Sequence, residues 1–155
     1  MKRLSEPMQR ALLEAEAAFA RGEVPVGAVV TDPQGQIVAA AGNRTRELCD
    51  PTAHAEILAI RAACRLAGVE RLTGHDLHVS LEPCTMCAAA ISFARIRRLY
   101  FGAGDPKMGA VEHGARVFGL ATCHHAPEIY SGIAEAEAAA LLQRFFAERR
   151  RQQPT

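Results

Sequence analysis

Two short motifs in the middle of this chain carry three metal-binding side chains and one acid. The first is His54-Ala55-Glu56, and the second, further along, is Pro83-Cys84-Thr85-Met86-Cys87. Histidine and cysteine are ligands that zinc prefers, and three protein ligands leave a fourth position open, as in catalytic zinc sites. Any fold of this chain therefore has to bring these two separate segments onto one ion.

Each motif is predicted at the beginning of a helix. Thr52 is a good helix cap, and a helix is expected from there to about Ala67. Pro83 is tolerated in the first turn of a second helix, which is expected to reach about Arg95. Residues three apart share a helix face, so the two cysteines of the second motif can bind one ion. The helix N-terminus also favours the thiolate form that zinc requires.

The acid of the first motif, Glu56, is the proton carrier that a hydrolytic reaction needs. Zinc lowers the pKa of a bound water from about 15.7 to about 7, which gives hydroxide at neutral pH. We expect Glu56 to take up that proton and later to deliver protons to a ring nitrogen and a departing amine. Attack on an amidine-type ring carbon then expels ammonia. A first-turn acid can also serve only to stabilise the helix dipole, but the neighbouring zinc ligand favours the catalytic role.

Two other uses of these ligands are open. A closed, purely structural zinc site needs a fourth ligand, and Cys123, His124 and His125 are candidates, although none stands at a matching short spacing. A thioredoxin-like redox role for the Cys-x-x-Cys pair would leave the His-x-Glu motif unexplained. The cysteines outside the motif, Cys49, Cys64 and Cys123, are interpreted as small buried or half-buried thiols.

The rest of the chain reads as a hairpin followed by alternating strands and helices. A helix that Ser5 can cap and that ends near Gly22 precedes the hairpin, whose turn is Asp32-Pro33-Gln34-Gly35. Such alternation predicts an α/β fold in three layers, α/β/α, with helices on both faces of a mixed sheet. Strands are expected over residues 24–31, 36–41, 77–81, 98–102 and 128–130, a loop-rich segment over 103–127 and a last helix over 134–150.

Composition is consistent with one soluble domain over residues 1–155, with 49% hydrophobic and 23% charged residues. The net charge of +1 provides no general attraction to nucleic acids, so such a signal has to be local. The chain has no apolar signal region and no stretch that could span a membrane, which predicts a cytoplasmic protein. In that reducing compartment a Cys-x-x-Cys pair favours metal binding over a disulfide.

The chain resembles the bacterial tRNA adenosine deaminases of the cytidine-deaminase-like zinc superfamily. The zinc motifs alone identify only the superfamily, whereas the Pro-Thr-Ala-His-Ala-Glu context and the Phe-Phe-x-x-x-Arg ending resemble the tRNA branch. The resemblance runs through residues 23–29, 50–60, 81–90, 92–102 and 145–150.

The resemblance implies a cytidine-deaminase-like sheet of five strands in the order 2-1-3-4-5. It also implies a homodimer with its active sites near the interface and one zinc ion per subunit. The implied substrate is adenosine at the wobble position of an arginine tRNA anticodon loop, converted to inosine.

Further site residues follow from the same resemblance. Asn43 matches an asparagine that hydrogen-bonds the flipped purine, although a turn residue is the simpler interpretation from sequence alone, and Val26 would line the base pocket. Asp105 and Lys107 match a loop beside the substrate backbone, with glycine at 104 where some members carry arginine. A role for His125 is implied only weakly.

The end of the last helix is locally basic. Four arginines stand against Glu148, which gives this segment a net charge of +3 (four minus one). Looped RNA is recognised by stacking and backbone charge, so Phe145, Arg149 and Arg150 are candidate RNA contacts. The alternative is a solvated helix end whose phenylalanines face the core. The arginines are Arg144, Arg149, Arg150 and Arg151, and the phenylalanines are Phe145 and Phe146.

Two competing functions share the zinc motifs. One is a deaminase of free bases or nucleosides, such as guanine or cytosine, and the other is an RNA-binding module that zinc only staples together. The stapled module predicts that Glu56→Ala is harmless, whereas both enzymes predict lost activity with intact zinc binding.

Overall fold

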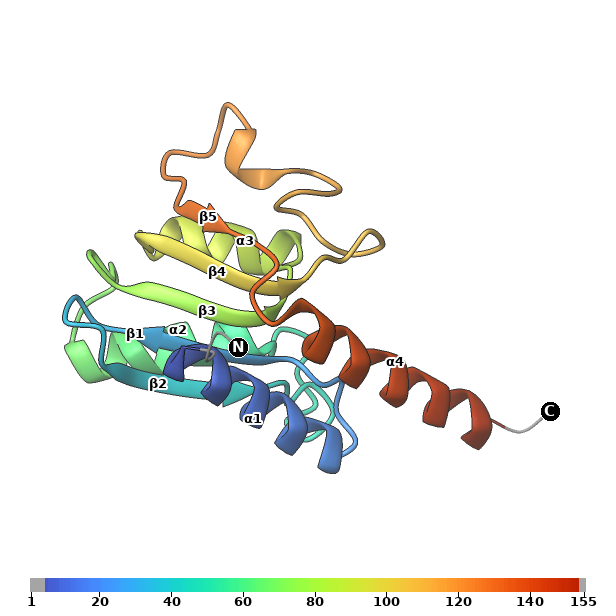
Figure 1. Ribbon diagram of the computed structural model, residues 1–155. Coiled ribbons are helices and arrows are strands. Elements are labelled where there is room, and N and C mark those ends of the chain that lie inside the picture. The colour runs from blue at the N-terminus through green and yellow to red at the C-terminus, as the bar shows by residue number, and fades with distance from the viewer. Residues whose placement is uncertain (1–4, 154–155) are drawn as a thin grey trace.

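Five strands form one mixed sheet in the order β2-β1-β3-β4-β5, in a computed structural model that describes residues 5–153 (Figure 1). Strand β1 is antiparallel to both β2 and β3, while β3, β4 and β5 run parallel. This order confirms the expected cytidine-deaminase-like sheet. The strands are β1 (Gly27–Thr31), β2 (Ile37–Gly42), β3 (Asp76–Leu81), β4 (Arg98–Ala103) and β5 (Glu128–Tyr130).

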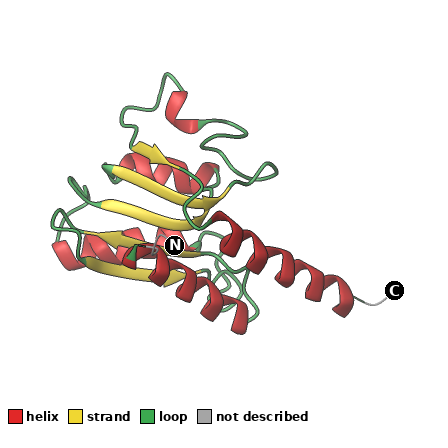
Figure 2. Cartoon of the chain, viewed as in Figure 1, coloured by secondary structure: helices red, strands yellow, loops and turns green. Residues whose placement is uncertain are grey.

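Helices cover both faces of the sheet, which confirms the three-layer arrangement (Figure 2). Helices α1 (Glu6–Ala20) and α4 (Glu135–Gln152) contact each other on one face, and α2 (Ala55–Ala67) and α3 (Thr85–Phe93) contact each other on the other. The core lies between these layers, and β1 is buried along its whole length. No helix among residues 5–153 combines the length and the apolar character that crossing a bilayer requires.

Helix α1 lies unusually close to the sheet because two strand ends have no side chain there. A Cβ added to Gly27 would lie 1.8 Å from the Ala11 carbonyl oxygen. One added to Gly42 would lie 2.7 Å from the Glu14 carbonyl oxygen. These glycines bring the C-terminal part of α1, and Arg21 after it, next to the end of β2.

Several expected boundaries differ from the structure by one to three residues, and three of them lie beside the His/Cys/Cys segments. The first strand begins at Gly27 instead of residue 24, because Val26 N–H donates to the Val24 carbonyl at 2.8 Å and turns the chain. The helices expected from Thr52 and Pro83 begin later, at residues 55 and 85. The Thr52 hydroxyl does not cap a helix but donates to Asp50 Oδ1 at 2.7 Å. As expected, residues 103–127 are mostly loop, with one short 3₁₀ helix (Val117–Gly119).

Candidate active site

His54, Cys84 and Cys87 come together where the first turns of α2 and α3 meet. His54 is the N-cap of α2, Cys84 is the N-cap of α3, and Cys87 lies in the first turn of α3. The His54 Nδ1 atom lies 3.6 Å from Cys84 Sγ and 3.5 Å from Cys87 Sγ. Tetrahedral zinc with ordinary bond lengths of about 2.3 Å to sulfur and about 2.0 Å to nitrogen would place such atoms about 3.5 Å apart. The donor set and its spacing therefore fit zinc.

Within residues 5–153, no fourth histidine or cysteine joins this cluster. Two of the three candidates for a closed site make other contacts, and His124 is outside the cluster. The His125 Nε2 atom lies 2.7 Å from the Ile96 carbonyl oxygen, and the Cys123 thiol donates to the His125 carbonyl at 3.2 Å. The geometry therefore favours a site with an open position over a structural staple.

The His54 side chain faces Cys84 and Cys87, and it therefore does not cap its own helix. Asn43, at the end of β2, satisfies the first helical N–H instead, since Asn43 Oδ1 accepts from Ala55 N–H at 2.8 Å. The Arg21 guanidinium donates to the Asn43 carbonyl at 3.1 Å and holds the backbone there. With Oδ1 occupied in this way, the amide nitrogen of Asn43 is the group left to serve a ligand as a donor.

Glu56 lies at the second position of α2 and is only 4% exposed. Burial raises the pKa of its carboxyl to about 7, against hydrogen bonding and the charge of His54. A carboxyl group with a pKa near the working pH can both accept and return a proton, as general acid–base catalysis requires. Glu56 faces the same pocket as His54 and Cys84.

This pocket has a volume of about 380 Å³ and is bounded by the N-termini of α2 and α3, the loop after β4 and helix α4. The pocket lining is mainly apolar, with polar groups close to the His/Cys/Cys cluster. Its lining residues are Val24, Val26, Asn43, Thr45, His54, Glu56, Leu81, Glu82, Cys84, Gly104, Asp105, Met108, Leu142 and Phe146.

The predicted substrate-binding residues fall into two groups. Val26, Asn43 and Asp105 line the pocket, and Lys107 is exposed on the same loop as Asp105. Phe145, in contrast, is 5% exposed and packs edge-on against the Phe19 ring at 5.6 Å. The first group therefore lies in the pocket or on a loop that borders it, whereas the Phe145 ring belongs to the core.

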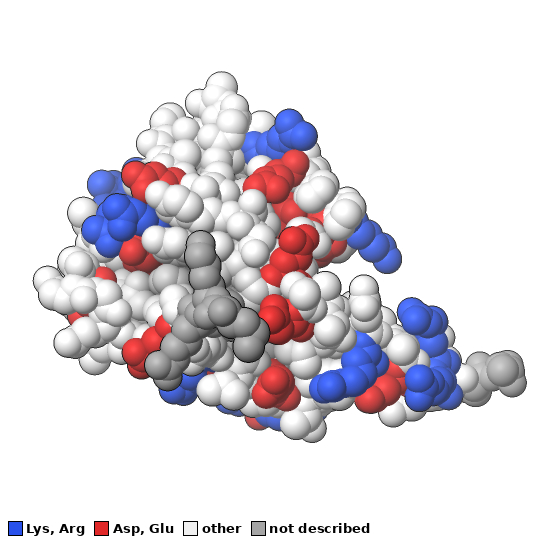
Figure 3. Space-filling view, viewed as in Figure 1, with Lys and Arg blue, Asp and Glu red and all other residues white. Residues whose placement is uncertain are grey.

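Helix α4 presents its aromatic and basic residues in different directions. Phe146, which is 45% exposed, lines the pocket that Phe145 does not reach. The Arg149 guanidinium lies over the Phe145 ring and donates to the Gly22 carbonyl at 3.0 Å, whereas Arg150 is exposed. In Figure 3 lysine and arginine atoms gather at the protruding end of α4.

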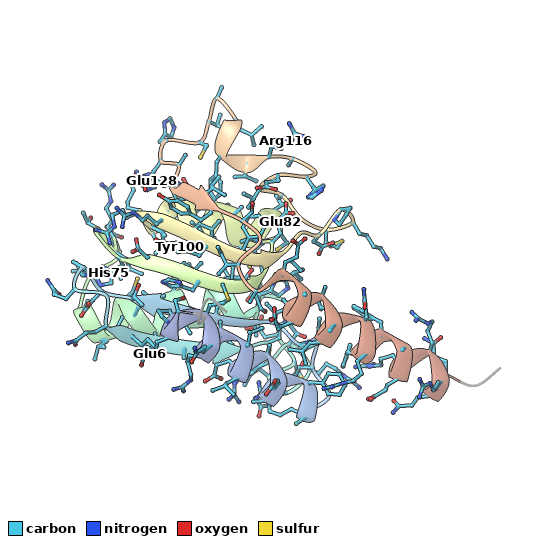
Figure 4. All side chains as sticks on the ribbon, viewed as in Figure 1. Glu6, His75, Glu82, Tyr100, Arg116 and Glu128 are labelled. Carbon is cyan, nitrogen blue, oxygen red and sulfur yellow. The ribbon has the colours of Figure 1, made fainter. Side chains whose placement is uncertain are left out.

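Sequence reasoning assigned no role to two buried acids beside the pocket. Glu23 accepts hydrogen bonds from the N–H groups of Arg46 and Glu47, at 3.0 and 2.9 Å. Glu82, labelled in Figure 4, lies beside the loop that follows β4. Burial acts to raise the pKa of Glu82, but hydrogen bonds led by that from Asp105 N–H hold this pKa below its usual range. The sequence places Glu82 directly after the expected strand over residues 77–81, but it gives no indication of the loop that its carboxylate binds.

Comparison with known proteins agrees with this geometry. The zinc-binding region of cytidine and deoxycytidylate deaminases matches residues 1–103. A tRNA-specific adenosine deaminase of Agrobacterium fabrum is 64% identical over 143 residues, which are 92% of this chain and 93% of the relative. The chain belongs to the tRNA-specific adenosine deaminases. A second tRNA-specific adenosine deaminase, from Rickettsia bellii, is 49% identical over 140 residues, which are 90% of the present chain and 97% of the relative.

A solved structure resembles this deaminase closely, with a TM-score of 0.86 at 64% identity. It covers 88% of this chain and 98% of its own, and comes from biochemical and structural studies of A-to-I editing by tRNA:A34 deaminases at the wobble position of transfer RNA. This deaminase uses zinc, and the three residues of the His/Cys/Cys cluster all lie within the segment that matches the family's zinc-binding region.

Proposed function

We propose that this deaminase converts adenosine to inosine at the wobble position, nucleotide 34, of tRNA by hydrolysis. The observation that carries the proposal is the buried acid Glu56 next to the His/Cys/Cys cluster, in a pocket of about 380 Å³ that is large enough for a base. The 64% identity to a tRNA-specific adenosine deaminase supports this choice of substrate over a free base. Arginine tRNA is the substrate that the sequence resemblance implies.

In this proposal His54, Cys84 and Cys87 hold one zinc ion per subunit. With zinc bound at this cluster, a water molecule becomes a strong nucleophile at neutral pH. Glu56 takes the proton of the attacking water and delivers protons to the purine ring nitrogen and to the amine, which leaves as ammonia. Its burial keeps competing water away from the carboxyl group.

The walls of the pocket orient the base. The Asn43 amide nitrogen donates to an acceptor on the purine, because its Oδ1 is already bound to Ala55 N–H. Val26, Leu142 and Phe146 provide apolar surface for the ring. The base has to leave the anticodon stack to reach this depth, as in other enzymes that modify a base.

The rim of the pocket is proposed to bind the anticodon stem-loop. Asp105 and Lys107 lie on the loop after β4, and Arg150 is exposed on α4, which supports a place for them beside the RNA backbone in this proposal. Arg149 contributes to the same basic surface. Phe145 is proposed to act indirectly, by supporting Arg149, because its ring is buried under that guanidinium.

We further propose a cytoplasmic homodimer of single-domain subunits, 1–155. One sheet joins residues 27–130, which supports a single domain.

Phe93, at the end of α3, is 77% exposed beside an apolar hollow of about 300 Å³ that Leu120 also lines, which supports contact with a second copy. Phe93→Arg should convert the dimer to a monomer in sedimentation equilibrium. A monomeric unmodified chain would contradict the dimer.

The catalytic proposal is tested with an arginine-tRNA anticodon stem-loop carrying adenosine at position 34. The unmodified protein should form inosine, and Glu56→Gln should form it about 10²- to 10⁴-fold more slowly with its zinc content unchanged. Cys84→Ala, the matched variant, should lose zinc as well as activity. Absence of inosine together with ammonia release from guanine or cytosine would establish the free-base deaminase instead.

A further inference from the structure

Glu82 is buried directly between β3 and the metal-binding segment, and its carboxylate is saturated with donors. Its Oε2 atom accepts from the N–H groups of Val111, Glu112 and His113, at 3.1, 3.0 and 3.1 Å. Its Oε1 atom accepts from Asp105 N–H at 3.0 Å and lies 2.6 Å from His113 Nδ1. Four of these five donors are backbone amides, so a single side chain fixes the path of the loop over residues 104–113.

The same loop is attached to the segment that carries the first cysteine of the cluster. Ala110 N–H donates to the Pro83 carbonyl at 2.9 Å, and Gly109 forms a β-bridge with Cys84. A Cβ added to Gly109 would lie 2.5 Å from both Cδ and Oε2 of Glu82. The carboxylate and the loop backbone are therefore packed against each other without space for adjustment.

The loop carries one wall of the pocket. Gly104, Asp105 and Met108 line it. Asp105 Oδ1 accepts from the N–H groups of Lys107 and Met108 at 3.1 and 3.0 Å. The position of Asp105 therefore fixes the backbone of both of these residues. Asp105 N–H is itself bound to Glu82, which lies two residues before Cys84. Glu82 therefore connects this wall of the pocket to the segment that carries the cysteines.

We propose that Glu82 is a positioning residue for deamination, which holds the 104–113 loop at a fixed distance from the metal-binding cysteines and so aligns the substrate with Glu56. The inference rests on the proposed function for its kinetic consequence but not for the structural one. Glu82 touches neither the reacting atoms nor the metal in this scheme. Its effect is transmitted through the loop backbone.

Glu82→Gln is the decisive substitution, because it keeps the size of the side chain and removes one acceptor. An amide nitrogen cannot accept a hydrogen bond. Whichever way the amide is turned, either the two donors at Oε1 or the three at Oε2 lose their acceptor. Displacing a substrate-positioning group by about 1 Å can lower a rate by about 10²-fold.

The experiment compares zinc-loaded wild-type protein, Glu82→Gln, His113→Ala and Asp76→Asn. Asp76 is the matched control, since it is a buried carboxylate at the opposite end of β3 and pairs with Arg97 at 2.9 Å, away from the pocket. His113→Ala removes one of the five hydrogen bonds without altering Glu82. Zinc stoichiometry, amide hydrogen exchange, and kcat and KM on the anticodon stem-loop are measured for each protein.

We expect Glu82→Gln to keep its zinc, to exchange the amides of residues 105 and 111–113 faster, and to lose about tenfold to 10²-fold in kcat/KM. His113→Ala should show the same changes to a smaller degree, and Asp76→Asn should stay within about twofold of wild type. Unchanged exchange or unchanged kcat/KM in Glu82→Gln would overturn the proposal. Zinc loss in Glu82→Gln with wild-type behaviour of His113→Ala would overturn it as well.

The exchange and zinc measurements need no substrate, which separates the two proposals. If the wild-type protein forms no inosine, the proposed function fails. The comparison of amide exchange between Glu82→Gln and Asp76→Asn then still decides whether Glu82 holds the loop.

Discussion

His54 and Cys84 occupy the N-cap positions of their helices, where a side chain ordinarily caps the exposed N–H groups. Here both side chains are directed at the metal cluster, and for α2 the capping role passes to Asn43. The ligand types and their spacing were predictable from sequence because they are local. The double use of Asn43 was not, since its Oδ1 meets a residue twelve positions away.

Asn43→Asp separates the two roles of this residue. The aspartate keeps an oxygen for Ala55 N–H but replaces the donor that faces the base by an acceptor. We expect kcat/KM on the stem-loop to fall by about tenfold to 10²-fold, since one lost hydrogen bond costs about 1–3 kcal/mol. The free energy of unfolding should change by less than about 1 kcal/mol in urea titrations, whereas the control Asn43→Ala should lose about 1–2 kcal/mol. Wild-type kinetics in Asn43→Asp would exclude the amide as a donor to substrate.

Helix α4 serves at the same time as a wall of the pocket and as a brace on α1. The pattern of apolar residues predicted the helix well, but it could not assign Phe145 to the core and Phe146 to the pocket. The two residues are adjacent in sequence, and what distinguishes them is which part of the fold each ring packs against. The start of α2 was predicted three residues early, because the sequence does not show which partner the Thr52 hydroxyl takes. A turn closed by Asp50 and Thr52 occupies the place where capping was expected.

Arg149 and Arg150 should differ in what they stabilise. Arg149→Ala removes a hydrogen bond to the Gly22 carbonyl and a contact with the Phe145 ring, so we expect a loss of about 1–2 kcal/mol in the free energy of unfolding. Arg150→Ala should change stability by less than about 0.5 kcal/mol but weaken stem-loop binding and reduce its salt dependence. Urea unfolding and fluorescence anisotropy at several salt concentrations measure these effects. Equal stability losses in the two variants would refute this division.

At the scale of the whole molecule, a ladder of rings links the strands on the side away from α2. The ring of His78 stacks on Tyr100 at 4.6 Å between centroids, and Tyr100 stacks on Tyr130 at 4.9 Å. His78 Nε2 also lies 3.2 Å from the Thr31 hydroxyl on β1. The family resemblance predicted the order of the strands, but this ladder depends on the register of β3, β4 and β5, which no local pattern specifies.

His78 should make stability depend on pH. Burial lowers the pKa of its imidazole to about 4, although the charge of Asp76 acts in the opposite direction. The unfolded chain, with an ordinary pKa of about 6.5, therefore takes up the proton first as the pH falls. This contribution to stability is present above pH 6.5 and is lost progressively towards pH 4, with about 2 kcal/mol lost between pH 7 and 5.

The matched variant is His78→Gln, which has no titrating group at this position. Urea unfolding of both zinc-loaded proteins at pH 7 and pH 5 should show a smaller loss of stability in the variant. An equal loss in both proteins would mean that the imidazole is protonated in the folded state.

The loop over residues 104–113 is anchored through its backbone amides, and this has a consequence for how the enzyme can change. Substitutions of the exposed side chains leave the anchors in place, so they can alter what the pocket accepts at little cost to the fold. Of the two glycines in this loop, Gly104 is the open one, because an added Cβ would lie 3.4 Å from His113 Cε1 and 3.7 Å from Glu82 Oε1, which are ordinary contacts. Gly109 is closed to such change. Laboratory evolution towards other bases or RNA contexts should therefore accumulate its substitutions at 104 and its exposed neighbours and spare 82 and 109.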